Sequence, residues 1–120
     1  MVIDWGFAGI GPLGEDPGNL VFDAVLDFFV RPGQFEELCH AVFSGSVEGA
    51  LDGGWTGDPD RLRRAMWALG AVKYLWVPPV MVETLAAGCP TLNRRPTEEA
   101  FLWWAPLVGP IIDFAGRALA

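Results

Sequence analysis

The residues with the clearest chemical potential lie at the start of the chain. A short apolar run, MVID, ends at Asp4, and a glycine-rich bend then leads to Glu15, Asp16 and Asn19 before an apolar stretch. A strand end holds a carboxylate in place, and a glycine-bearing turn leaves room for a phosphate-bound ion. Mg²⁺ sites often combine one or two carboxylates with substrate phosphates. We therefore expect Asp4 to be a candidate magnesium ligand.

The elements expected to position this motif are helices. Beyond Asp16 the apolar residues recur with the 3.6-residue period of a helix, and only MVID has the pattern of a strand. Residues 34–51 form a clear amphipathic stretch, and Asp58 followed by Pro59 supplies a cap and a first-turn proline. The pattern predicts a mainly α single domain over residues 1–120, with four to five helices and a short N-terminal β-strand.

The third predicted helix is apolar nearly all round and is expected to be central. One predicted stripe consists of Leu62, Met66, Leu69, Val72 and Trp76. We expect Lys73, alone among these apolar residues, to reach the surface along its aliphatic stem; a buried cation paired with an acid is the less favoured alternative. Pro78 and Pro79 are expected to break or kink the helix.

The segment CPTLNRRP is predicted to be a linker between the fourth and fifth helices. Thr97 is the expected N-cap of the last helix, followed by acids in its first turn. Pro106 and Pro110 interrupt the apolar stripe of that helix, so we expect it to be bent.

Isolated polar residues elsewhere have simple structural interpretations. Asp23 and Asp27 lie one turn apart and are expected to form a solvated face rather than a ligand pair. His40 falls on the polar face of the second helix and is expected to be exposed. Cys39 and Cys89 lack C-x-x-C spacing, which favours reduced, buried thiols over a disulfide or a metal site.

The composition predicts more apolar surface than this chain can bury. Of its 120 residues, 52% are hydrophobic, including six Trp and eight Phe, and a chain of this length buries only about two-thirds of its unfolded surface. We expect tight helix packing, or apolar surface that meets a partner, a second copy or a membrane surface.

The charge and the hydropathy pattern exclude several classes of partner. A net charge of −7 with only eight Lys and Arg argues against nucleic-acid binding. The longest apolar run, AMWALGAVKYLWVPPVMV, contains Lys73 and a proline pair, so we predict no membrane span. No export leader is recognisable, and the expected location is the cytoplasm.

The opening segment VIDWGFAGIGPLGEDPGNL resembles aminoglycoside phosphotransferase-like enzymes. In that family a hydrophobic strand ends in I-D-W or a variant, and a G-D-P type turn leads into the first large helix of the C-terminal lobe. The later VKYLW and LNRRPTEEAFLWWAP are similar to the rest of that lobe, so the resemblance covers almost the whole chain. It implies a protein-kinase-like fold and ATP-dependent phosphoryl transfer to a small-molecule hydroxyl, with Mg²⁺ and ATP as cofactors.

The resemblance also implies roles for three residues. Asp4 matches the acid that holds Mg²⁺ between the ATP phosphates, and Asp16 matches the turn acid that braces the catalytic loop. Asn19 stands three residues later, where the family usually has a second acid. The resemblance thus implies that Asp16 and Asn19 support the site structurally.

The catalytic loop that the family carries upstream of its metal aspartate is absent from this chain. That loop reads H-G-D, followed a few residues later by N, whereas the only histidine here is His40, followed by Ala41 and Val42. We therefore expect no catalytic residue and no tight binding of Mg²⁺ or ATP. The chain is expected to be a truncated C-terminal lobe, inactive without a missing N-terminal lobe and a small-molecule acceptor. The alternative is an independent helical module that binds an apolar small molecule or a partner helix.

Overall fold

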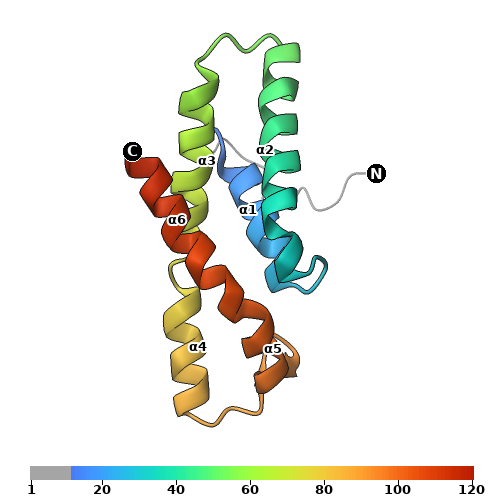
Figure 1. The fold of residues 1–120 in the computed structure, drawn as a ribbon, viewed down its shortest axis with the longest axis vertical. Coiled ribbons are helices and arrows are strands. Elements are labelled where there is room, and N and C mark those ends of the chain that lie inside the picture. The colour runs from blue at the N-terminus through green and yellow to red at the C-terminus, as the bar shows by residue number, and fades with distance from the viewer. Residues whose placement is uncertain (1–11) are drawn as a thin grey trace.

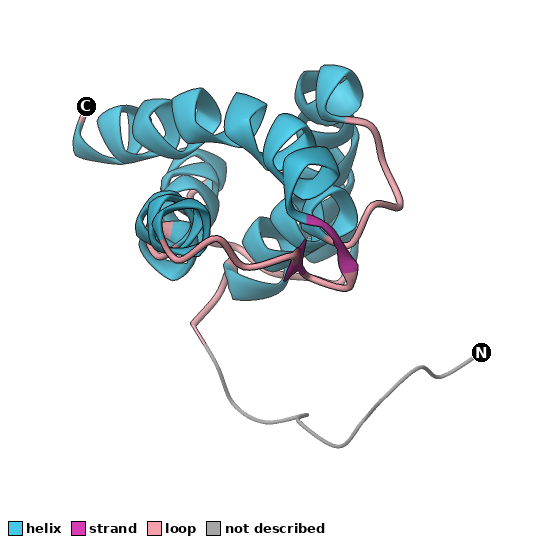
Figure 2. Ribbon diagram, turned by 90° about the horizontal axis from the view of Figure 1, so that it is seen from below, coloured by secondary structure: helices cyan, strands magenta, loops and turns pink. Residues whose placement is uncertain are grey.

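The structure is a computed structural model, which describes residues 12–120; the predicted strand ending at Asp4 lies outside them. Most of the described residues lie in helices, and the structure also contains one small two-stranded sheet (Figure 2). The elements in chain order are α1 (Glu15–Leu26), α2 (Phe35–Asp52), α3 (Pro59–Tyr74), α4 (Val77–Ala86), β1 (Thr91–Leu92), β2 (Arg95–Pro96), α5 (Thr97–Trp104) and α6 (Val108–Leu119). Single 3₁₀ turns, Pro32–Gln34 and Ala105–Leu107, precede α2 and α6. The predicted mainly α class is confirmed.

Two pairs of helices continue one another, so the described chain forms four helical rods (Figure 1). α3 continues into α4 through a turn at Leu75–Trp76, and α5 continues through its 3₁₀ turn into α6. Pro78 and Pro79 lie in the first turn of α4, where a missing N–H leaves no helical bond unmade. The four rods agree with the predicted four to five helices, and both proline interruptions fall where they were expected.

Helix α1 lies between α2 and α3, and α6 packs against α3 and crosses the bundle diagonally (Figure 1). The ring of Phe22, on α1, is fully buried. Its centroid lies 5.0 Å from that of Phe35, 4.6 Å from Tyr74 and 5.2 Å from Phe114. Three other elements therefore converge on one aromatic side chain of α1, which fixes this helix inside the bundle.

Glycines allow α1 and α3 to approach each other closely. A Cβ atom on Gly18 would lie 3.0 Å from the Met66 carbonyl oxygen and 3.1 Å from the Gly70 nitrogen. Gly14, the N-cap of α1, has φ 101° and comes as close to the backbone of Met66. Because the contacts are backbone to backbone, no larger residue fits without separating the helices. The glycine-rich bend therefore ends in a packing motif.

The predicted linker CPTLNRRP forms a β-hairpin instead. Thr91 pairs with Pro96, and Leu92 pairs with Arg95. The two turn residues, Asn93 and Arg94, both have positive φ, 47° and 64°. Left-handed conformations at both central positions are typical of a type I′ turn, which matches the twist of the two strands.

Thr97 is not the N-cap that the sequence predicts. It is the first residue of α5, the cap position belongs to Pro96, and no side chain caps the helix. The Thr97 hydroxyl donates to the Cys89 carbonyl instead, because the hairpin brings the two residues together. By contrast, the predicted cap of α3 is confirmed: the Asp60 N–H donates to Asp58 Oδ1 at 2.9 Å.

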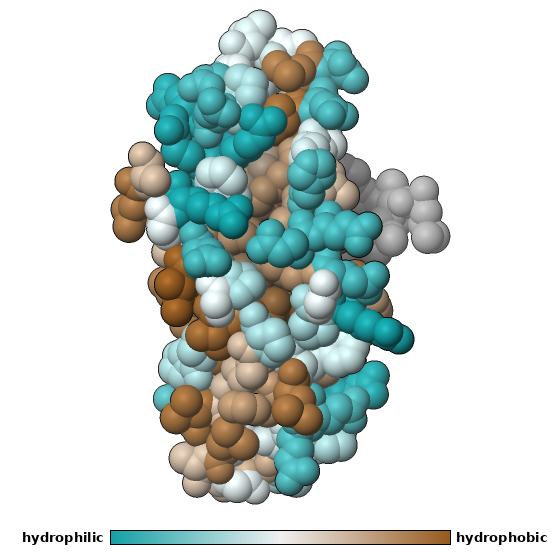
Figure 3. Space-filling view, viewed as in Figure 1, coloured by the Kyte–Doolittle hydropathy of each residue, from teal (hydrophilic) through white to brown (hydrophobic). Residues whose placement is uncertain are grey.

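The predicted apolar stripe of α3 is only partly buried. Leu62 and Met66 belong to the core, but Val72 is 69% exposed and Trp76 is 45% exposed. The remaining core positions of α3 are Ala71 and Tyr74. A helix that is apolar nearly all round does not itself specify which side faces inward. Packing against the neighbouring helices α1 and α6 determines which side of α3 is buried. Apolar side chains therefore remain on the molecular surface (Figure 3).

Candidate functional site

A groove of about 400 Å³ lies between the first turns of α1 and the middle of α2. Its lining from α1 comes from Asp16, Pro17, Asn19 and Leu20, and its lining from α2 comes from Val42 and Ser46. Gly14 and Gly18 face α3, so the side of α1 that carries Asp16 is directed away from that contact. The groove brings together the two predicted support residues, Asp16 and Asn19.

Asp16 is exposed in the first turn of α1, beside Glu15. Unpaired backbone N–H groups and the helix dipole make this end of a helix positive, which favours both carboxylates. A carboxylate at the start of a helix can accept helix-terminal N–H bonds, but here the N-cap is Gly14 and no side chain caps α1. Within residues 12–120 the Asp16 carboxylate accepts no hydrogen bond and remains accessible to a partner.

Asn19 has a buried oxygen that finds no partner within residues 12–120. Its Oδ1 atom is shielded from solvent and accepts no hydrogen bond from any residue in the described part of the chain. An unsatisfied buried acceptor costs roughly 1–3 kcal/mol, so native proteins keep few of them. The start of α1 thus contains two polar side chains that form no side-chain hydrogen bond with the described part of the chain.

One turn further along α1, the polar contacts are complete. The buried hydroxyl of Tyr74 donates to Asp23 Oδ1 at 2.5 Å and lies 3.2 Å from the Asn19 carbonyl oxygen. Burial, reinforced by the bond to Asp23, raises the pKa of the Tyr74 hydroxyl, which therefore remains a donor at neutral pH. Asp23 is exposed as predicted, but its carboxylate also anchors α1 to α3.

At the C-terminal end of α1, side-chain donors from the second half of the chain satisfy the last carbonyls. Trp103 Nε1 donates to the Val25 oxygen at 2.9 Å, and Trp104 Nε1 donates to the Leu26 oxygen at 3.0 Å. Asn93 Nδ2, from the hairpin turn, also donates to the Leu26 oxygen, at 2.9 Å. These three contacts supply the caps that a helix end requires, and the sequence pattern did not indicate them.

Phe28 follows this end of α1 in a left-handed conformation, with φ 65°. Such a conformation is uncommon for a residue with a side chain, so the surroundings must hold it in place. The guanidinium of Arg95 lies 5.1 Å from the centroid of the Phe28 ring, and the Trp103 ring lies 5.5 Å away. Asp27 accepts a 3.2 Å bond from Asn93, which ties the predicted solvated face to the hairpin.

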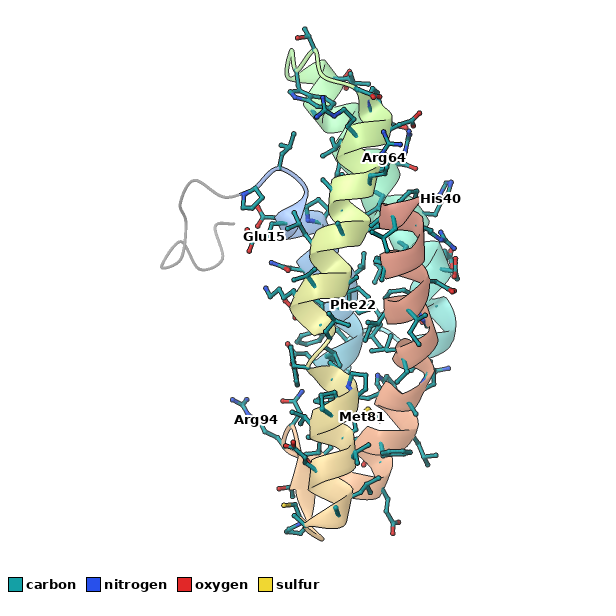
Figure 4. All side chains as sticks on the ribbon, turned by 90° about the vertical axis from the view of Figure 1, so that its left-hand side faces the viewer. Glu15, Phe22, His40, Arg64, Met81 and Arg94 are labelled. Atoms are coloured by element: carbon teal, nitrogen blue, oxygen red, sulfur yellow. The ribbon has the colours of Figure 1, made fainter. Side chains whose placement is uncertain are left out.

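The histidine, lysine and cysteine side chains discussed in the sequence analysis do not line the groove. His40 is exposed on α2, as predicted (Figure 4). Lys73 is exposed, as expected, with its Nζ atom 5.8 Å from the centroid of Tyr74. Cys39 and Cys89 are free thiols, as predicted, but only Cys39 is partly buried and Cys89 is exposed. Burial raises the pKa of the Cys39 thiol to about 12, which keeps it protonated and unreactive.

Residues 12–120 contain no cluster of three or more His, Cys, Asp or Glu side chains suited to a metal ion. Asp4, the predicted magnesium ligand, lies outside these residues, so no metal ligand is assigned within them. In the same range, Pro59–Ala86 is long and apolar enough, by length and composition alone, to cross a membrane. The core helix of a soluble protein passes the same test, and the absence of a membrane span stays a prediction.

Comparison of the chain with protein-family models, with curated proteins and with solved structures gives no match.

Proposed function

We propose that this chain is the helical lobe of an aminoglycoside phosphotransferase-like protein, which takes part in ATP-dependent phosphoryl transfer together with an upstream nucleotide-binding lobe. The observation that carries the proposal is the start of α1. There Asp16, with an accessible carboxylate, and Asn19, with a buried oxygen that has no partner within residues 12–120, line one groove. The groove lies at the end of the glycine-rich bend that follows the I-D-W motif, which the family likeness assigns to metal binding. Neither polar group has a hydrogen-bond partner within residues 12–120, and the resemblance assigns Asp16 to bracing a catalytic loop.

The proposal assigns this chain a positioning task. Asp16 accepts N–H bonds from the catalytic loop of the upstream lobe, and Asn19 completes its bonding with the same loop. In the complete enzyme, Asp4 binds the Mg²⁺ that neutralises the ATP phosphates. The acidic helical surface suits an acceptor that carries amino groups. Without the upstream lobe the reactants are not positioned, and the chain alone is inactive.

The in-frame codons upstream of Met1 provide the simplest test. We expect them to encode H-G-D followed a few residues later by N, after a nucleotide-binding lobe. Codons without this motif would contradict the proposal.

A biochemical test joins the chain to the nucleotide-binding lobe of a complete aminoglycoside phosphotransferase-like enzyme, cut just before its I-D-W strand. We expect ATP-dependent phosphorylation of an aminoglycoside, which Asp4→Asn abolishes. Asp16→Asn should lower the rate at least about tenfold without unfolding the protein. Asp52→Asn, which removes an exposed acid at the far end of α2, is the control and should leave the rate unchanged. An equally active Asp4→Asn fusion would refute the assigned roles.

A second candidate function, an independent helical interaction module, is favoured by one observation. Large apolar side chains are exposed in several parts of the described chain: Phe29, in the loop after α1, at 83%, Leu102 on α5 at 76% and Leu119 on α6 at 90%. Under this alternative, the DNA upstream of the Met1 codon contains a promoter and a ribosome-binding site and does not encode the H-G-D motif.

A further inference from the structure

An apolar strip follows the outer side of α3 and α4. It consists of Val72, Leu75, Trp76, Pro79 and Val82, all exposed, which we call the α3–α4 strip. Val72 is 69% exposed, Leu75 is 56% exposed and Val82 is 65% exposed. Because α4 continues the direction of α3 (Figure 1), these residues share one side of a single rod, opposite the core residues of both helices.

The charges beside the strip are few and opposite in sign. Between Val72 and Glu83 the only charged residues are Lys73, at one end, and Glu83, at the other. Both are exposed and neither forms an ion pair within residues 12–120. The segment 72–83 is therefore neutral, although the chain as a whole carries a net charge of −7.

We propose that the α3–α4 strip is the interface of a symmetric homodimer, in which the strips of two copies pack antiparallel. A two-fold contact requires a surface that is complementary to itself. Val72 and Val82 are equally far from Val77 along the sequence, so a two-fold axis at Val77 places the Val72 of one copy opposite the Val82 of the other.

The same axis brings the two charges together. Lys73 precedes Val77 by four residues and Glu83 follows it by six, a mismatch of two residues or about 3 Å along the helix. The flexible lysine stem spans this distance, so each end of the contact gains one pair between Lys73 and the Glu83 of the second copy. A second copy thus meets both the apolar and the charged part of the strip.

A lipid surface fits the strip less well. Helices that lie on membranes present a polar face rich in Lys and Arg beside their apolar face, whereas here a single lysine accompanies the strip and the chain is acidic. The contact is also small, since residues 72–82 rise only about 15 Å along the axis. It is smaller than the roughly 800 Å² per partner of a standard interface, and we expect a dimer with Kd in the micromolar range.

Sedimentation velocity of the full chain, at about 1 to about 500 μM, tests the proposal. We expect a dimer to accumulate as the concentration rises. Leu75→Glu should raise Kd at least about tenfold, because it places a charge in the apolar contact. The control is Leu51→Glu at the end of α2, where another exposed leucine, 45% accessible, lies away from the strip; it should leave Kd unchanged. Circular dichroism checks that both variants are folded.

A charge exchange tests the antiparallel arrangement separately. Lys73→Glu or Glu83→Lys alone sets like charges against each other and should weaken the dimer, whereas the double variant should restore it. A chain that stays monomeric at every concentration would overturn the proposal. So would a dimer that tolerates Leu75→Glu, a double variant that is not restored, or a monomer that instead binds vesicles of zwitterionic lipid.

Discussion

The two ends of α1 differ in how completely they are bonded. At the C-terminal end, two indole N–H groups and one amide donate to the last carbonyls, and an aromatic and cationic cluster holds Phe28. At the N-terminal end, Asp16 and the Asn19 oxygen have no partner within residues 12–120. Both ends are held in place by close contacts, so loose packing does not explain the difference.

We call the C-terminal end of α1 the closed end and the N-terminal end the open end. Residues at the closed end stabilise the fold, whereas Asp16 and Asn19 at the open end have polar groups that form no such bonds within residues 12–120. The closed end can be explained by stability alone, because the Val25 and Leu26 carbonyls and the Asp27 carboxylate each accept a hydrogen bond from a distant side chain. Within residues 12–120 the open end holds a buried oxygen without a donor, which is unfavourable and is not explained by the stability of these residues. We therefore expect substitutions at the closed end to unfold the protein, and polar substitutions at the open end to change only what it binds.

The largest expected effect is at the closed end. Trp104 is 2% exposed, and its indole both fills the core and donates to Leu26. Trp104→Ala leaves a cavity and removes the bond, so we expect a loss of about 3–5 kcal/mol in the free energy of unfolding. Urea denaturation followed by circular dichroism measures it. Trp76→Ala, at a 45% exposed tryptophan, is the control and should cost less than half as much.

A smaller but still substantial effect is expected at Gly18, where the open end depends on glycine for its packing. Gly18→Val forces a side chain against the backbone of Met66 and Gly70, and overpacking of this kind costs about 1–3 kcal/mol or more. The same urea assay applies. Gly49→Val is the matched control, because a side chain at this position of α2 meets nothing within 4 Å. Equal losses in the two variants would show that α1 and α3 do not approach as closely as described.

Tyr74→Phe tests the polar contact between the two ends. Loss of the hydroxyl removes the bond to Asp23, and because water can solvate the exposed carboxylate the change should cost about 0.5–1.5 kcal/mol at neutral pH. Because the pKa of Tyr74 is raised in the folded protein, by burial first and by Asp23 second, its stabilisation is complete below the unfolded value of about 10. Above that pH it is lost, by at most about 1.4 kcal/mol per pH unit.

Urea melts at increasing alkaline pH measure this loss, which Tyr74→Phe should not show. Cys39 titrates in the same range, since burial raises its pKa to about 12. Both proteins should therefore carry Cys39→Ala. A parallel alkaline loss in the two proteins would rule out Tyr74 as its source.

The smallest expected effect is that of Asp16→Asn at the open end. Because its carboxylate accepts no cap bond, the change should alter the free energy of unfolding by no more than about 0.5 kcal/mol. Thermal and urea melts of the isolated chain measure this. A loss above about 1 kcal/mol would mean that Asp16 has a structural partner, and the contrast between the two ends would then weaken.

Local signals predicted the parts of the fold that depend on neighbours in sequence. The cap at Asp58 and the proline interruptions are short-range effects, and both were confirmed. The indole caps of α1 could not be foreseen, since their donors lie 78 residues away. The hairpin was missed because its turn, Asn93–Arg94, lacks the glycine that usually marks such turns. The buried side of α3 could not be chosen from an apolar pattern that surrounds the helix.

The candidate site was predictable in part. The bend and its acids drew attention to Asp16 and Asn19, and both line the same groove. The sequence pattern does not predict that the Asn19 oxygen is buried or that Tyr74 donates a hydrogen bond to Asp23. Each depends on how α1 packs against a helix that is distant in sequence. The role of Asp4 stays a prediction.

The distance along the chain between α1 and its caps determines the order of events during synthesis. A ribosome adds about 5–20 residues per second, so Val25 emerges several seconds before the Trp103 that caps it, 78 residues later. During that interval the described elements that can cover the apolar face of α1 are α2, α3 and α4, because α5 and α6 are not yet made. We therefore expect chains that end before α5 to expose α1 and aggregate, and the nascent protein to depend on chaperones until its last two helices are made.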